Sequence, residues 1–280
     1  MEHLLRKEML EEFRRELEED EKAAVTIEKY MRDVKTFWLY AGEENPVDKG
    51  VMIAYKEHLV ERYCISSVNS MLAAVNVFLK WLGWYDCTVK SLKVQKEAFR
   101  AGEKELSREE YRRLLDAAKS TGKIRLYLIM QTLCSAGLRV SELPYVTAES
   151  LRTGRAQVYA KGKGRVVLLS ESLCKKLRQY AQEQGIETGS LFVTRSGRPV
   201  DRSNIGHEMK ALCRAAGVSE EKVFPHNLRH LFATQYYETQ KDLSHLADLL
   251  GHSSVNTTRI YTLVSSKEQE RQIEALGLVV

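Results

Sequence analysis

Two arginines of this 280-residue chain lie in unusually apolar surroundings. Arg139 follows the run LCSAGL, and Arg229 lies within FPHNLRHLFA. Burying a guanidinium group without a partner is costly, so an arginine in such a segment usually holds an anion. For Arg139 the anion can be internal, because Glu142 follows three residues later and can reach it. A bound ligand is the other explanation, and the sequence leaves both open.

The residues around these arginines favour a shared site. Pro225 suits the first turn of a helix, so His226 and Arg229, three residues apart, are predicted to point the same way. The backbone N–H groups at a helix start also attract an anion. A second apolar stripe at helical spacing ends at Gly251, a natural C-cap, so His252 is predicted to emerge just past a helix end.

Histidines are concentrated in the same region. Four of the seven fall within 27 residues: His226, His230, His245 and His252. His226 and His230 have the i, i+4 spacing of a helical metal pair, so a metal-dependent hydrolase is one alternative. Against it, Arg229 stands between the two, no acidic residue completes an H-E-x-x-H motif, and no cysteine is close in sequence.

The segments SAGLRVSEL, HNLRH and LLGHSSVNTTRIY, with a lysine-bearing hairpin between the first two, resemble the tyrosine recombinase (phage integrase) family, especially its Xer-like members. A lone tyrosine is ordinarily a packing residue, and it is the whole set that carries the resemblance. The family signature R…K…H-x-x-R…H…Y falls here on Arg139, Lys161, His226, Arg229, His252 and Tyr261.

The chain departs from the family pattern in two ways. The hairpin reads KGKGR, about one residue shorter than the commoner turn of the family. We favour Lys161 as the signature lysine, and Lys163 is the alternative. The chain also begins almost directly with the core-binding domain, without the additional arm-binding domain of larger integrases.

The resemblance implies a phosphodiester transfer that uses neither metal nor ATP, and therefore no cofactor. Charged donors must then stabilise the phosphate oxygens, a role we assign to Arg139, Arg229 and His252, with Glu142 orienting Arg139. Permanently charged, planar guanidinium groups suit this task because they donate two hydrogen bonds at once.

The nucleophile implied by the family is Tyr261. A phenol has a reference pKa of about 10 and attacks poorly unless a neighbour accepts its proton, for which His226 is the candidate. Lys161 would protonate the departing 5′-oxygen, leaving a 3′-phosphotyrosyl enzyme that conserves the energy of the broken bond. A catalytically inactive DNA-binding protein of the same fold is the second alternative.

The elements that would position these residues are mainly helical, with a small β-sheet in the C-terminal domain. Four apolar patterns at helical spacing, over residues 4–22, 26–39, 47–60 and 66–82, predict a four-helix unit, with Thr26 capping the second helix. In the family this unit is the SAM-like core-binding domain. We place it at 1–87, a basic linker at 88–106, and an α+β catalytic domain at 107–280.

Local signals subdivide the catalytic domain. Ser107 with Glu110 is a capping-box pattern that opens a helix. Residues 156–160 and 165–169 predict a β-hairpin around a turn at 161–164, and 191–194 is a further strand candidate. Residues 267–275 predict a short tail helix. The resemblance implies that it docks on a neighbouring protomer, and folding back onto its own domain is the alternative.

Composition agrees with a soluble cytoplasmic DNA-binding protein. No apolar run reaches the ~18 residues of a membrane span, no signal peptide opens the chain, and the five cysteines form no C-x-x-C pair. The net charge is +5, yet residues 2–22 carry −4, which leaves +9 on the remainder. That basic excess suits nucleic acid as a partner.

The partners follow from the resemblance. They are double-stranded DNA with paired inverted-repeat sites, gripped by both domains, and three further copies of the chain in a ring on DNA. The free protein is expected to be a monomer.

Overall fold

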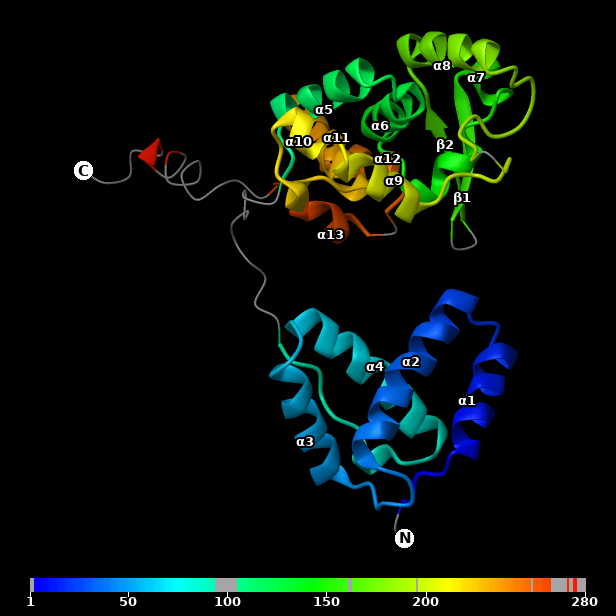
Figure 1. The fold of residues 1–280 in the computed structure, drawn as a ribbon. Coiled ribbons are helices and arrows are strands. Elements are labelled where there is room, and N and C mark those ends of the chain that lie inside the picture. Colours follow the sequence, from blue (N-terminus) through cyan, green and yellow to red (C-terminus); the bar gives the residue numbers. More distant parts are fainter. Residues whose placement is uncertain are drawn as a thin grey trace. The chain divides into compact units, whose positions relative to one another are not determined.

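The computed structural model describes residues 3–93, 105–160, 163–194, 196–252, 254–262, 271, 274 and 275 (Figure 1). The chain divides into two compact units, residues 1–96 and 97–280. Most of the predicted basic linker and most of the predicted tail helix lie outside the described residues. In the part of the chain that is described, no helix is long and apolar enough to cross a membrane.

The first unit contains the four predicted helices: α1 (Glu8–Glu19), α2 (Ala24–Ala41), α3 (Lys49–Val60) and α4 (Ile65–Trp81). A short 3₁₀ turn, η1 (Tyr85–Cys87), follows them. One face of each helix is apolar, and these faces meet in a core that includes Phe13, Phe37, Tyr55 and Phe78. The predicted cap at Thr26 is wrong, because α2 begins two residues earlier and Ala23 occupies its N-cap without a side-chain bond.

The second unit is larger. Its elements in chain order are α5 (Arg108–Ser120), α6 (Ile124–Ala136), η3 (Val140–Tyr145), α7 (Ser150–Thr153), β1 (Arg155–Ala160), β2 (Lys163–Leu168), α8 (Glu171–Glu183), α9 (Arg202–Lys210), α10 (Cys213–Ala216), η4 (Glu220–Lys222), α11 (Pro225–Gln240), α12 (Leu243–Leu250), α13 (Val255–Thr258) and η5 (Arg259–Thr262).

Helix α6 is the centre of this unit, and it packs against α5, α8 and α11. Its sequence is apolar on nearly all sides, which is typical of a helix surrounded by others, and Leu126, Ile129, Met130 and Leu133 are buried. The capping box predicted at Ser107 is confirmed: its hydroxyl accepts the Glu110 N–H at 3.1 Å, and the Glu110 carboxylate accepts the Ser107 N–H at 2.8 Å.

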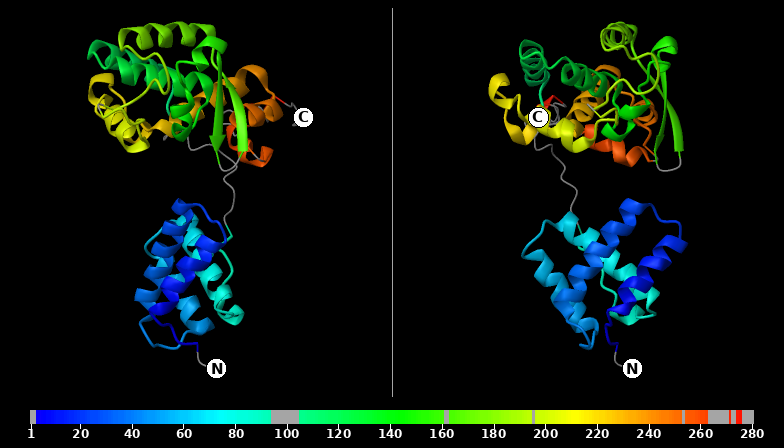
Figure 2. Two further views of the ribbon diagram at one scale, coloured as in Figure 1. Left: turned by 90° about the vertical axis from the view of Figure 1, so that its right-hand side faces the viewer. Right: turned by 45° about the vertical axis from the view of Figure 1, so that its right-hand side comes forward.

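The two strands form an antiparallel hairpin at the edge of the unit opposite α10 (Figure 1 and the right-hand view of Figure 2). Its pairing runs from Arg155 with Leu168 to Ala160 with Lys163. The predicted four-residue turn is therefore too long, because Lys163 and Gly164 already pair with β1. The further strand predicted at 191–194 is wrong, since Val193 forms only an isolated bridge with Pro199.

Candidate active site

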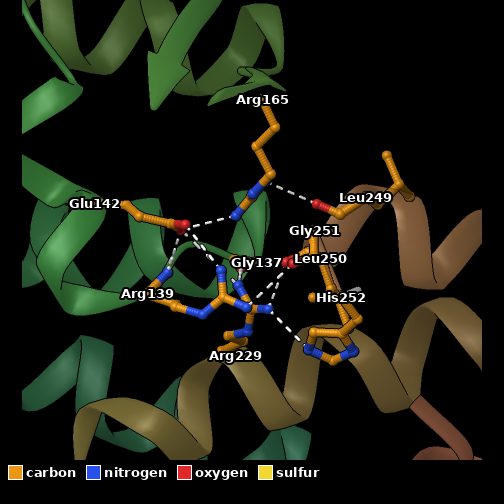
Figure 3. A network of polar contacts seen from close by, with 9 residues as sticks. All are labelled: Gly137, Arg139, Glu142, Arg165, Arg229, Leu249, Leu250, Gly251 and His252. Atoms are coloured by element: carbon orange, nitrogen blue, oxygen red, sulfur yellow. Dashed lines mark hydrogen bonds and ion pairs between the residues drawn. The ribbon is translucent and has the colours of Figure 1, made fainter. Parts of the chain in front are cut away.

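Three arginines from three separate segments of the chain surround one buried carboxylate (Figure 3). Glu142, in η3, has a side chain that is 1% exposed. It accepts hydrogen bonds from Arg139 Nη1 at 3.0 Å and Arg165 Nη2 at 2.7 Å, and Arg229 Nη1 lies 3.9 Å away. The internal ion pair considered for Arg139 is thus present, and Glu142 is shared with two further guanidinium groups.

Local chain geometry places Arg139 and Glu142. Gly137 ends α6 in a left-handed conformation with φ of 59°. A Cβ there would lie 2.5 Å from the Phe232 ring, so both the turn and the close packing require glycine. The chain then enters η3, where the Glu142 carboxylate accepts the backbone N–H of Arg139 at 2.8 Å. That bond fixes the carboxylate beside the arginine it pairs with.

The C-terminal end of α12 holds the same three arginines from the other side. The carbonyl of Leu249 accepts from Arg165 at 2.8 Å, that of Leu250 from Arg229 at 2.7 Å, and that of Gly251 from Arg139 at 3.4 Å (Figure 3). The last carbonyls of a helix have no partners within the helix, and they form the negative end of its dipole. They are therefore well suited to bind cations.

Arg229 is the most buried of the three, at 1% exposed. Pro225 stands in the first turn of α11, as predicted, and the helix turns Arg229 inward, where Nη1 also donates to the Gly137 carbonyl at 2.6 Å. Desolvation and the nearby Arg139 lower the pKa of Arg229 to about 10. The group therefore remains a cation at neutral pH.

His252 follows the helix end, as predicted, and accepts a hydrogen bond from Arg229. Its Nε2 lies 3.1 Å from Arg229 Nη2, and its Nδ1 lies 2.8 Å from the hydroxyl of Thr258. A guanidinium only donates, so Nε2 must be unprotonated and Nδ1 carries the proton. Desolvation and the charge of Arg229 lower the pKa of His252 to about 4, which keeps the ring neutral.

Of the remaining signature residues, the structure describes Tyr261 and His226. Tyr261, in η5, is 3% exposed; its ring lies edge-on to that of His230 at 4.8 Å between centroids and 6.5 Å from that of His252. His226 is exposed, unlike Arg229 on the same helix. Partial desolvation and the charge of Arg229 lower the pKa of His226 as well. Lys161 lies outside the described residues, and Lys163 is described only in its backbone.

The four clustered histidines do not share a metal position. His230 packs on Tyr261, His245 Nδ1 lies 2.6 Å from the Tyr236 hydroxyl, and His252 is engaged by Arg229. Among the described residues the one group with ligand-like spacing comprises His3, Asp86 and Cys87, in the first unit. The geometry therefore gives no support to the metal-hydrolase alternative.

Arg165 is the member of the network that the sequence analysis missed. In β2 it shares a face with Val167, and Leu169 follows in the same alternation; both are buried. Side chains two residues apart point to the same side of a strand, so this alternation directs Arg165 inward. The period-two pattern of the strand was the signal in the sequence that could have identified Arg165.

Both units match known families. Residues 104–268 match the model of the phage integrase family, and residues 10–85 match that of the phage integrase N-terminal SAM-like domain. The chain is 32% identical to tyrosine recombinase XerA of Thermococcus kodakarensis over 97% of this chain and 96% of that protein. It is 30% identical to tyrosine recombinase XerD of Lacticaseibacillus casei, over 88% and 89% of the two chains.

Solved structures give the same result. A XerA recombinase crystal structure covers 98% of this chain, and this chain covers 99% of it, with 27% identity and a TM-score of 0.53. A lambda integrase tetramer bound to a Holliday junction shares the fold, with a TM-score of 0.73 at 17% identity over 91% of this chain and 76% of that one. The chain belongs to the phage integrase family. Within it, the chain is a tyrosine-type site-specific recombinase, as the resemblance predicted.

Proposed function

We propose that this recombinase cleaves and rejoins DNA through a 3′-phosphotyrosyl intermediate at Tyr261. The observation that carries the proposal is the cation cluster beside that tyrosine. Three guanidinium groups share a single carboxylate, which leaves a net charge of +2 in a largely buried network. Excess positive charge of this kind is costly unless an anion neutralises it, and a phosphodiester is an anion of suitable geometry.

The transfer step balances without a cofactor. The Tyr261 oxygen attacks phosphorus and forms a new P–O bond while the bond to the 5′-oxygen breaks. The phenol proton passes to His226, whose lowered pKa keeps its ring neutral and able to accept it. Lys161 protonates the departing 5′-oxygen. A 5′-hydroxyl from the same or another strand reverses these steps, so neither ATP nor metal is needed.

Arg139 and Arg229 bind the non-bridging phosphate oxygens in this mechanism. Arg139 is the more accessible, with its side chain 35% exposed, whereas Arg229 is almost enclosed. His252 accepts a hydrogen bond from Arg229 at Nε2, and its Nδ1 bonds the Thr258 hydroxyl. The imidazole can therefore donate to phosphate only after one of these hydrogen bonds is exchanged. Because Tyr261 is also buried, DNA binding must rearrange η5 and the residues around it before attack.

A covalent adduct is the direct test. A DNA site is first selected by binding from a random-sequence library, then built as a duplex with a nick that lets the cleaved 5′ fragment diffuse away. Wild-type protein should become linked to the 3′ end, with EDTA present and ATP absent. Tyr261→Phe should bind this duplex equally well but form no adduct. The matched control Tyr237→Phe, in α11, should behave as wild type.

Two outcomes would contradict the proposal. Adduct formation by Tyr261→Phe at the wild-type level would remove the assigned nucleophile. A wild-type protein that binds the duplex tightly but never becomes linked would favour the inactive DNA-binding alternative. Binding itself should weaken steeply as salt rises, because phosphate contacts release counterions.

Assembly on DNA is the second part of the proposal. Exchange between two duplexes requires four strand cleavages, and four copies in a ring supply them. A groove of about 530 Å³ between α5, α6 and α11 is lined by apolar residues that include Leu115 and Leu231, and by Arg108 and Arg112. The tail of a neighbouring copy, with apolar Leu276 and Leu278 and several glutamates, has the chemistry to occupy this groove.

A further inference from the structure

Arg165 connects the hairpin to the cation cluster. Its Nη2 donates to Glu142 at 2.7 Å and its Nη1 to the Leu249 carbonyl at 2.8 Å, so one guanidinium joins β2, η3 and the end of α12. Its side chain is only 16% exposed. Among the described side chains of the hairpin, no other makes a hydrogen bond to α12 or to Glu142.

The path of the Arg165 side chain depends on Gly251. A Cβ at that glycine would lie 2.4 Å from Arg165 Cδ and 2.6 Å from its Nε. The arginine therefore occupies space that exists only because position 251 carries no side chain. The buried Nε has no hydrogen-bond partner, so the contact is held by the two terminal nitrogens alone. The Gly251 carbonyl in turn accepts from Arg139.

These contacts define where β2 sits relative to the phosphate-binding arginines. Arg165 and Arg139 share the Glu142 carboxylate, and they donate to the Leu249 and Gly251 carbonyls at the C-terminal end of α12. A two-stranded hairpin has little stability of its own, so an anchor of this kind decides its position. Arg165 follows Lys163 by two residues and Lys161 by four, so the anchor stands close in sequence to both lysines.

We infer that Arg165 is a positioning residue that fixes the hairpin against Glu142 and the end of α12, so that the hairpin can deliver a proton to the departing 5′-oxygen. The inference rests on the proposed function, in which a hairpin lysine supplies that proton. Arg165 itself touches no reacting atom in this assignment. Its loss should slow the protonation of the leaving group while leaving DNA binding almost unchanged.

The leaving group provides a specific test. Single-turnover cleavage is measured on the selected nicked duplex and on the same duplex with sulfur in place of the scissile 5′-oxygen. A thiolate leaves without being protonated, so this substrate does not need the general acid. Arg165→Ala should cleave the ordinary duplex about a hundredfold more slowly, the usual scale of general acid catalysis, and the sulfur duplex at nearly the wild-type rate. Arg165→Lys, which retains one donor, should fall between.

Controls separate the possible failures. Arg155→Ala removes an exposed arginine at the start of β1 of the same hairpin and should cleave both duplexes like wild type. Equal loss of Arg165→Ala on both duplexes would overturn the inference, because the arginine would then serve the phosphate site as a whole. Cleavage of the ordinary duplex by Arg165→Ala within about threefold of the wild-type rate would overturn it as well. If wild-type protein forms no adduct on either duplex, it is the proposed function that fails.

Discussion

Glu142 is the residue on which the arrangement of the site depends. Among the described residues it is the one acidic group in a network with three guanidinium groups, and its two oxygens accept hydrogen bonds from Arg139 and Arg165 directly. Removing the charge from such a group leaves buried cations without compensation, which costs more than the intact ion pair contributes. An ordinary surface ion pair has no comparable effect, because water solvates both partners.

Replacing this carboxylate by its neutral isostere measures the effect. Glu142→Gln should destabilise the second unit by about 3 kcal/mol or more, the scale of breaking a buried pair, as measured by urea unfolding. The same substitution at Glu171, which pairs with Arg178 at the surface of α8, is the control and should barely shift the transition. Equal small shifts in both variants would show that Glu142 does not organise the arginines.

Arg139 and Arg229, the two arginines proposed to bind phosphate, should differ when replaced. Arg139→Ala should lose about 3 kcal/mol of transition-state stabilisation, roughly a hundredfold in cleavage rate, while the variant stays folded. Arg229→Ala should lose activity and also stability, because it leaves the Gly137 and Leu250 carbonyls buried without a donor. Single-turnover cleavage and thermal unfolding check both. Cleavage by Arg139→Ala within a factor of about ten of wild type would contradict the phosphate role.

The lowered pKa of His252 predicts that the stability of the fold depends on pH. Its pKa of about 4 in the folded chain lies below the value of about 6.5 in the unfolded chain. Between these two pH values the unfolded chain binds a proton at this histidine and the folded chain does not. Its contribution to stability is therefore complete above pH 6.5 and is lost progressively as the pH falls toward 4. Melting temperatures between pH 7 and 5.5 should decline less steeply in His252→Gln, with His207→Gln, an exposed histidine of α9, as the control. An unchanged slope in His252→Gln would contradict the assigned protonation state.

At the scale of elements, the C-terminus of α12 is the common support of the site. The carbonyls of Leu249, Leu250 and the capping residue Gly251 each accept from one arginine, namely Arg165 of β2, Arg229 of α11 and Arg139, which immediately precedes η3. His252 follows directly after Gly251. Gly251 allows this arrangement for two reasons. It adopts a left-handed conformation with φ of 62°, and its missing side chain leaves room for that of Arg165. The helix end and the hairpin are thereby fixed to each other.

A pair of glycine substitutions separates these two roles. Gly217 ends α10 with φ of 61°, nearly that of Gly251, but a Cβ there would contact nothing within 4 Å. Both Gly217→Ala and Gly251→Ala should pay the cost of a left-handed alanine, about 1 kcal/mol. Gly251→Ala should in addition displace Arg165 and slow cleavage. Equal effects of the two substitutions on unfolding and on cleavage would show that the space at Gly251 is unimportant.

At the scale of the whole molecule, two units with separate cores serve one reaction. The first contains the SAM-like helices and the second contains the arginine network, each with its own buried apolar cluster. The net charge of −4 over residues 2–22 leaves the basic excess to the rest of the chain, where phosphate contacts would be made. The proposed assembly on DNA depends on the contact between one copy and the next.

Deleting residues 266–280 tests the proposed contact between copies. The truncated chain should bind a single DNA site almost as well as wild type but fail to form tetramers on paired sites or to recombine them, as followed by native gel electrophoresis. Replacing Arg108 and Arg112 by glutamate should produce the same defect from the side of the groove. Tetramers formed normally by the truncated chain would show that the tail is not the contact.

The sequence by itself determined the features that arise within a few residues. The capping box at Ser107, the proline start of α11 and the glycine end of α12 were all predicted and confirmed, because each depends on bonds between near neighbours. The resemblance to the family, too, was evident from six signature residues in order. Tertiary structure alone decided which distant residues share a partner. Arg165 reaches Glu142 across 23 positions and Leu249 across 84, and the burial of Tyr261 depends on how η5 packs on α11. Such contacts follow from the packing of whole elements, which no local pattern specifies.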